Sequence, residues 1–264
     1  MKLMEYWKFW KDYFKMEIMA HLAYPNQFVM FIFASLVFSA AGPIFAILIY
    51  STGHGIPGWT FEEFLLFSGT VTLFSGLVLT FFVAQIWRIP RQIENGEFDK
   101  HLLRPIHMVP YTFLTGSDVD GFGNIIAGLV IIGYAIFAGN FHITLLSIML
   151  YIILFILGIL IEFCITLYII GLSLLFVKSE TIRQIMDTVF EFVRNPINIY
   201  SGFVQFIFTF IIPYSLATYY PVQALLGKVN PVYFVPIFAA VAVFMTFAIA
   251  FFNFTIKKYT SAGG

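Results

Sequence analysis

The chain has 264 residues, of which 60% are hydrophobic and only 11% are Asp, Glu, Lys or Arg. Soluble domains carry roughly 25% charged residues, so this composition excludes an ordinary soluble protein and predicts an integral membrane protein. Fourteen cations balance fourteen anions, and without a dominant basic surface we expect no nucleic-acid partner. The single cysteine, Cys164, excludes an intrachain disulfide.

Long apolar stretches dominate the chain from residue 28 onward. A run of about 18 or more apolar residues is long enough to cross a bilayer as a helix. Six such spans are expected, at residues 28–50, 64–87, 119–138, 143–177, 197–218 and 231–256. The sequence therefore predicts an all-α integral membrane protein with six transmembrane helices, folded as a single transmembrane domain over residues 1–264.

The cations are distributed unevenly between the two sides of these spans. Lys and Arg are retained on the cytoplasmic side of a membrane. Thirteen of the fourteen lie before the first span, after the last, or in the connections between spans two and three and between four and five. Only Lys228 lies opposite. We therefore expect a cell-membrane protein, in a bacterial inner membrane, with both termini cytoplasmic.

Three further segments have a pattern of their own. Residues 2–22 repeat charges at close to the helical period, with Trp and Tyr on the other face, which predicts an amphipathic interfacial helix. Residues 179–195 predict a second cytoplasmic amphipathic helix. Residues 211–231 are aromatic and interrupted by prolines, which favours an outer re-entrant segment over a solvated loop.

The connection between spans two and three is unusually polar. It consists of residues 88–110, "RIPRQIENGEFDKHLLRPIHMVP". Pro90 suits the first turn of a helix, and Asn95-Gly96 can end that helix with a left-handed residue. A second short helix is expected at residues 97–103. Because two spans could be joined by far fewer residues, we interpret the segment as a cytoplasmic docking element, the alternative being a helix that merely lies on lipid head groups.

The sequence lacks the common motifs of catalysis and cofactor binding. It contains no P-loop, no G-x-G-x-x-G, no H-E-x-x-H and no G-x-S-x-G. The five histidines are scattered and have no partner at ligand spacing, so we expect no metal site. The chain is predicted not to be an enzyme and to hold no cofactor of its own.

One carboxylate, Glu162, lies deep in a predicted span. An unpaired carboxylate there costs on the order of 3 kcal/mol. Glu162 shares a helical face with Thr166, so it belongs either to a polar path or to a structural hydrogen bond. Ser68 and Thr72 form a similar stripe in the second span, where helix packing and a path are again the alternatives. Gly42-Pro43 predicts a kink in the first span.

Two stretches carry a resemblance to a known family. "NGEFDKHLLRP" resembles the segment after the second span in permease subunits of type-2 ATP-binding-cassette exporters, and "NPINIYSGFVQFIFTFIIPYSLATYYPVQALLG" is similar to a later segment of the same family. The resemblance implies a coupling helix that contacts a separate P-loop ATP-binding subunit, which would bind ATP and magnesium. Its residues would be Gly96, Glu97, Asp99, Leu103, Arg104 and Pro105.

The same resemblance implies the general function. Residues 2–22 would form the connecting helix, and the translocation path would lie between two permease chains, the second being a copy of this one or a similar permease. We thus expect an export permease that hydrolyses nothing itself, with no particular substrate indicated. The two alternatives are a proton-linked secondary carrier that uses Glu162, and a non-transporting membrane scaffold.

Overall fold

The computed structural model describes residues 3–53, 55–103, 107–115, 117–176, 184, 188, 190–192, 194–230, 232 and 234–260. These residues form helices and turns, with no strand among them. Five helices are long and apolar enough to cross a membrane: Pro25–Ser51, Phe61–Glu94, Phe122–Gly139, Leu145–Leu175 and Phe234–Lys258. The all-α membrane fold is therefore confirmed, whereas the count of six spans stays a prediction.

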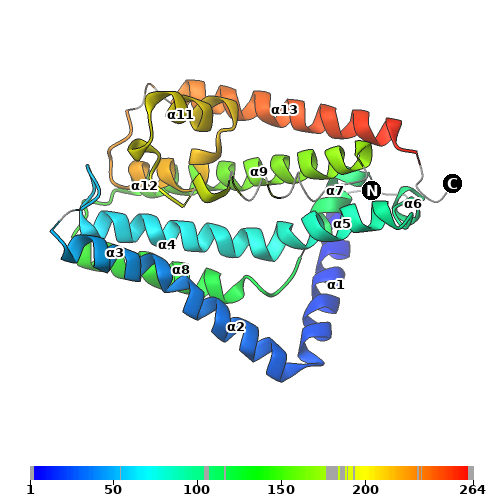
Figure 1. The fold of residues 1–264 in the computed structure, drawn as a ribbon, viewed down its shortest axis with the longest axis horizontal. Coiled ribbons are helices and arrows are strands. Elements are labelled where there is room, and N and C mark those ends of the chain that lie inside the picture. The colour runs from blue at the N-terminus through cyan, green and yellow to red at the C-terminus, as the bar shows by residue number, and fades with distance from the viewer. Residues whose placement is uncertain are drawn as a thin grey trace.

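The first helix, α1 (Leu3–Leu22), crosses the direction of the long helices (Figure 1). Its aromatic side chains do not all face outward, because Phe14 contacts Phe122 at 6.2 Å between ring centres and Trp10 Nε1 donates to Ser117 Oγ at 3.2 Å. The next helix is interrupted at Ala40, between α2 (Pro25–Ser39) and α3 (Ala41–Ser51), as the Gly-Pro pair predicts.

The second span is longer than predicted. A capping box starts α4 (Phe61–Val78), with the Thr60 side chain accepting from the Glu63 amide at 3.3 Å. The helix continues through a π segment, η1 (Leu79–Val83), into α5 (Ala84–Glu94). Within the π segment, the Thr80 carbonyl accepts from the Asp118 amide at 2.7 Å. Pro90 therefore lies inside one continuous helix, and the prediction that it opens a new helix is wrong.

This helix ends where the sequence predicts. Gly96 has φ +70, and the Glu97 amide bonds to the Gln92 carbonyl at 2.8 Å. The Gly96 amide bonds to the Ile93 carbonyl at 3.2 Å, which completes a Schellman motif. The expected short helix follows as α6 (Asp99–Leu102), shorter than predicted, and α7 (Met108–Leu114) comes after it.

The helix α8 (Phe122–Gly139) packs antiparallel against α4 through small residues. A Cβ added to Gly128 would lie 2.5 Å from the Leu73 amide nitrogen, and one added to Gly76 would lie 2.7 Å from the Ile125 nitrogen. Helices in a membrane approach this closely only where side chains are small. The two backbones are therefore held together by van der Waals contact along most of their length.

The two C-terminal long helices run in the same direction. In α9 (Leu145–Leu175) and α13 (Phe234–Lys258), Leu154 and Ile237 share one buried cluster, and Leu174 and Phe252 share another. The two helices lie side by side in Figure 1.

The segment predicted as a single helix at 197–218 is broken into short elements. It consists of η2 (Ile197–Ile199), α11 (Gly202–Phe206), η3 (Ile207–Ile211), η4 (Tyr214–Ala217) and α12 (Tyr219–Leu225). The continuous part, Gly202–Ile211, is too short to cross a bilayer. The chain bends at Ile212-Pro213, because proline supplies no amide hydrogen. Most of the expected helix at 179–195 lies outside the described residues.

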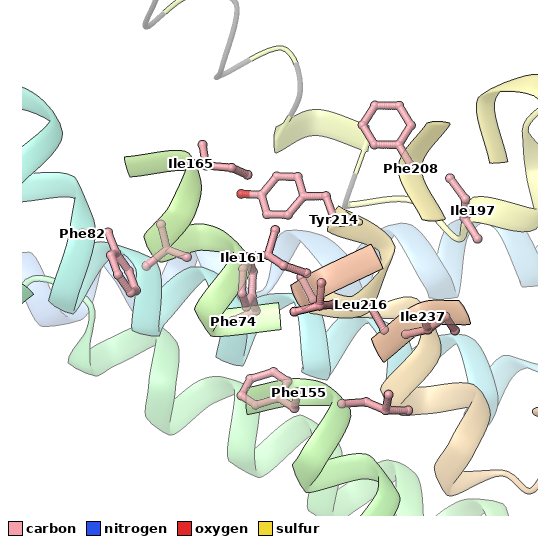
Figure 2. Packing of buried hydrophobic residues seen from close by; sticks show 14 of the residues in the cluster. Phe74, Phe82, Phe155, Ile161, Ile165, Ile197, Phe208, Tyr214, Leu216 and Ile237 are labelled. Atoms are coloured by element: carbon pink, nitrogen blue, oxygen red, sulfur yellow. The ribbon is translucent and has the colours of Figure 1, made fainter. Parts of the chain in front are cut away.

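A central cluster of buried residues joins α4, α9, α13 and the segment after Pro213. Figure 2 shows Phe74, Ile161, Leu216 and Ile237 packed together in it. Gly158 permits a close approach here, since a Cβ there would lie 2.5 Å from Ala217 Cα. The segment after Pro213 is therefore part of the core, and this packing fixes the positions of its polar side chains.

Candidate functional site

Two adjoining cavities lie along α4, on the side of the polar stripe. The larger, of about 620 Å³, is lined by Ser68 and Thr72 with aromatic residues of α2, α3 and α4. The smaller, of about 320 Å³, is lined by Glu162 and Tyr214. Three side chains line both and so join them: Ser75, Asn124 and Arg194. We call the joined space the α4 cavity.

Three of the four predicted path residues therefore border one space, although they come from helices far apart in the sequence. Thr72 donates its hydroxyl to the Ser68 carbonyl at 2.9 Å, and Gly42 packs against the Ser68 hydroxyl. Thr166 is buried, donates to the Glu162 carbonyl at 3.0 Å, and does not border the cavity. Its place in a path stays a prediction.

Glu162 has a specific partner that the sequence does not indicate. Its side chain is 3% exposed, and the Tyr214 hydroxyl donates to Oε2. Figure 2 shows the Tyr214 hydroxyl directed toward α9. Pro213 starts the 3-10 turn that carries this tyrosine, and Phe74 holds its ring edge-on at 6.1 Å between centres. The hydrogen bond compensates part of the cost of burying a carboxylate.

Asn124 and Arg194 are further residues that the sequence analysis missed. The Asn124 amide oxygen accepts from Ser39 Oγ at 2.8 Å, which links α8 to α2. Arg194 has half of its side chain exposed, lies 3.2 Å from a Glu191 oxygen and stacks on the Phe190 ring at 5.6 Å. Asn124 was the one amide in the third predicted span, which is the signal that could have singled it out.

The predicted docking element lies at the end of the bundle that carries Lys257 and Lys258. Phe98 is fully buried and packs edge-on against Tyr259 at 5.2 Å, so it anchors α6 to α13. His101 bonds to Gln92 Oε1 and to the Tyr111 hydroxyl, each at 2.8 Å. The element is thus fastened to α5, α7 and α13.

Leu103 and Glu97 lie on the outward face of this element. Leu103 is 86% exposed, and Glu97 lies 3.7 Å from Lys100 in an exposed ion pair. Asp99 begins α6, one turn after Gly96. Arg104 and Pro105 lie outside the described residues.

A third cavity, of about 400 Å³, separates α1 from the docking element. Tyr13 bridges its two charged groups, donating to Glu17 at 2.7 Å and accepting from Arg88. Burial raises the pKa of Tyr13 to about 12, and the hydrogen bond to Glu17 adds to the shift. The phenol is therefore neutral at physiological pH, and it ties the predicted connecting helix to α5.

The opposite end of the bundle is closed by polar contacts. Lys228 bonds to the Glu63 carboxylate at 2.7 Å, and Trp59 donates to Asn198 at 3.0 Å. The first contact joins the turn after α12 to the start of α4, and the second joins the preceding loop to η2. The lone cation of the predicted outer side is thus paired.

One group among the described residues has the composition of a metal site. His21, Asp118 and Asp120 offer ligand atoms within 4.8 Å of one another, so His21 is not the isolated histidine that the sequence suggested. His21 Nε2 lies 3.0 Å from Asp118 Oδ1, which is a hydrogen-bonding distance. The contact ties the end of α1 to the loop before α8.

These features define a multi-pass membrane protein, with long apolar helices around a polar cavity and an anchored polar element at one end. The family model described as "ABC-2 family transporter protein" matches residues 29–263. Because the match covers nearly the whole chain, the protein belongs to this family, and it is the membrane component of an ATP-binding-cassette transporter. The resemblance noted from the two motifs is confirmed. No curated protein matches the sequence.

Proposed function

We propose that the protein is the permease subunit of an exporter, coupled to separate ATP-binding subunits through the element at residues 96–103. The observation that carries this proposal is the construction of that element. Phe98 is fully buried and fixes it to the bundle, while Leu103 is 86% exposed beside the Glu97–Lys100 pair. An anchored element with an exposed apolar side chain suits transmission of a partner's movement into the helices.

The direction of that transmission follows from the contacts of α6. Phe98 touches Tyr259, the residue directly after α13, and His101 touches α7 through Tyr111. A displacement of α6 therefore acts on α13 and on the segment that leads to α8. Nucleotide-driven closure of the partners would shift the equilibrium between two arrangements of the bundle only if the docked contacts differ between them.

The path itself would be the α4 cavity. Phe38 and Phe45 line it and are 78% and 50% exposed, so the cavity reaches the apolar surface of α2 and α3. A second permease chain on that surface would enclose the cavity between two bundles. We propose this dimer, with both termini cytoplasmic, on the basis of the cation distribution and the family.

The test replaces Leu103 by aspartate in the assembled transporter. We expect Leu103→Asp to abolish co-purification with the ATP-binding subunit and to leave thermal stability unchanged, since the side chain is exposed. Asn230→Asp, which adds the same charge to an exposed residue outside the element, is the matched control and should co-purify normally. Normal assembly and transport of Leu103→Asp would contradict the proposed coupling.

Glu162 favours one alternative, a carrier driven by protons, because it is a buried carboxylate that borders the cavity. Transport assays in reconstituted vesicles distinguish the two mechanisms. Transport that needs ATP and survives Glu162→Gln supports the permease. Transport driven by a pH gradient alone and lost in Glu162→Gln would support the carrier.

A further inference from the structure

Few charged side chains line the α4 cavity, and they differ in how accessible they are to a bound molecule. Among its described lining residues, only Glu162 and Arg194 are charged. Glu162 is 3% exposed and already accepts a hydrogen bond from Tyr214. A molecule in the cavity therefore meets one accessible charge, which is positive.

The guanidinium group of Arg194 has more N–H donors than its contact with Glu191 uses. A guanidinium group offers five N–H donors in a planar fork that matches carboxylate and phosphate oxygens. Glu191 lies 3.2 Å from Nη1 and is itself exposed, and the guanidinium stacks on Phe190. With half of the Arg194 side chain exposed, a ligand oxygen can reach the remaining donors.

The cavity is otherwise lined by apolar groups. Phe38, Phe45, Phe64 and Phe67 form much of the larger part, and aliphatic residues of α4, α5 and α9 form much of the smaller. The uncharged polar side chains of the lining are Ser39, Ser68, Thr72, Ser75, Trp87, Asn124, Asn195 and Tyr214. The Asn124 oxygen already accepts from Ser39. Volumes of about 620 and 320 Å³ fall in the usual range of small-molecule sites, about 300–1,000 Å³.

We propose that the cargo of this transporter is an amphiphile with an anionic head group, a carboxylate or a phosphate. The head binds at Arg194, where both parts of the cavity meet, and the apolar body lies against the aromatic residues of α2, α3 and α4. This inference rests on the proposed function and specifies its substrate class.

The experiment measures binding to the intact permease–ATPase complex in nanodiscs of zwitterionic lipid, without ATP. The probes are three amphiphiles with the same brominated chain and a phosphate, a trimethylammonium or a glucoside head. Bromine quenches the fluorescence of Trp87, which lines the smaller part of the cavity. A Trp87→Phe variant identifies the signal of that residue among the four tryptophans.

The phosphate probe should bind most tightly. Arg194→Gln should weaken it about tenfold or more, the usual effect of losing a charge-assisted hydrogen bond, and should not weaken the trimethylammonium probe. Arg194→Lys, which keeps the charge, should retain most of the affinity. Lys257→Gln removes an exposed cation that does not line the cavity, and it should change nothing.

Two results would overturn the proposal: equal affinity for the three head groups in the native protein, or an equal loss for all three in Arg194→Gln. Because binding is measured without ATP, either result leaves the coupling proposal intact. Conversely, failure of the Leu103→Asp prediction would leave the head-group preference unaffected.

Discussion

Replacing Gly128 by alanine should separate α4 from α8. The added Cβ would lie 2.5 Å from the Leu73 nitrogen and 2.7 Å from Leu73 Cα, about 0.9 Å inside the 3.4 Å at which ordinary van der Waals contact begins. Both atoms belong to the backbone, so no side-chain rotation relieves the overlap and one helix must move.

The expected change in the free energy of unfolding is the sum of two opposing effects. Overpacking of this kind costs about 1–3 kcal/mol. The Gly→Ala change inside a helix returns about 0.5–1 kcal/mol, because glycine loses more backbone entropy on folding. Gly133, on the same helix, isolates the second effect, since a Cβ there has nothing within 4 Å. The difference between Gly128→Ala and Gly133→Ala should therefore equal the packing cost alone.

The assay compares the two variants by thermal unfolding in one detergent. For chains of about 150–250 residues, 1 kcal/mol shifts Tm by about 2–4 °C. Gly133→Ala should equal or slightly exceed the native Tm, whereas Gly128→Ala should lie about 2–12 °C below Gly133→Ala. Equal Tm values for the two variants would refute the close approach of α4 and α8.

Three further predictions concern the two ends of the bundle. Glu63→Ala should lower Tm more than Lys228→Ala, because Glu63 completes the capping box of α4, worth about 1 kcal/mol, in addition to pairing with Lys228. The reverse order would contradict this. The pKa of Tyr13 is raised from the usual 10 to about 12, so its neutral form stabilises the fold fully below pH 10 and this stabilisation is lost as the pH rises through 12. The Tm of the native protein should therefore fall over this pH range. Tyr13→Phe should lack the part of that fall that comes from ionisation of the phenol. In a Cys164→Ser background, an impermeant maleimide added to intact cells should label Lys228→Cys but not Lys257→Cys, and labelling of the latter would reverse the proposed orientation.

Much of the architecture follows from local properties of the chain. Long apolar runs predict helices, because a backbone in hydrocarbon must satisfy its own hydrogen bonds. The left-handed Gly96 and the break near Gly42-Pro43 were predicted from residue types whose conformational limits are intrinsic. These predictions hold because each depends on a few neighbouring residues.

The errors have a common cause, which is contact between distant segments. Pro90 remains inside a helix that is buried on one side, and the Thr80 carbonyl in the adjacent π segment accepts a hydrogen bond from the Asp118 amide. The chain at 197–218 does not form a continuous helix, because its bent form packs against α9, where Gly158 leaves room for it. Hydropathy gives no sign of either contact.

The candidate site divides in the same way. The sequence by itself determined that Glu162 needs a partner and that residues 88–110 form a polar element too long for a simple connection. Only the tertiary structure decided that the partner is Tyr214, that Arg194 and Asn124 join the cavity, and that Phe98 lies inside while Leu103 lies outside. The physical reason is that a local pattern specifies which groups must be satisfied, whereas packing between helices specifies which groups meet.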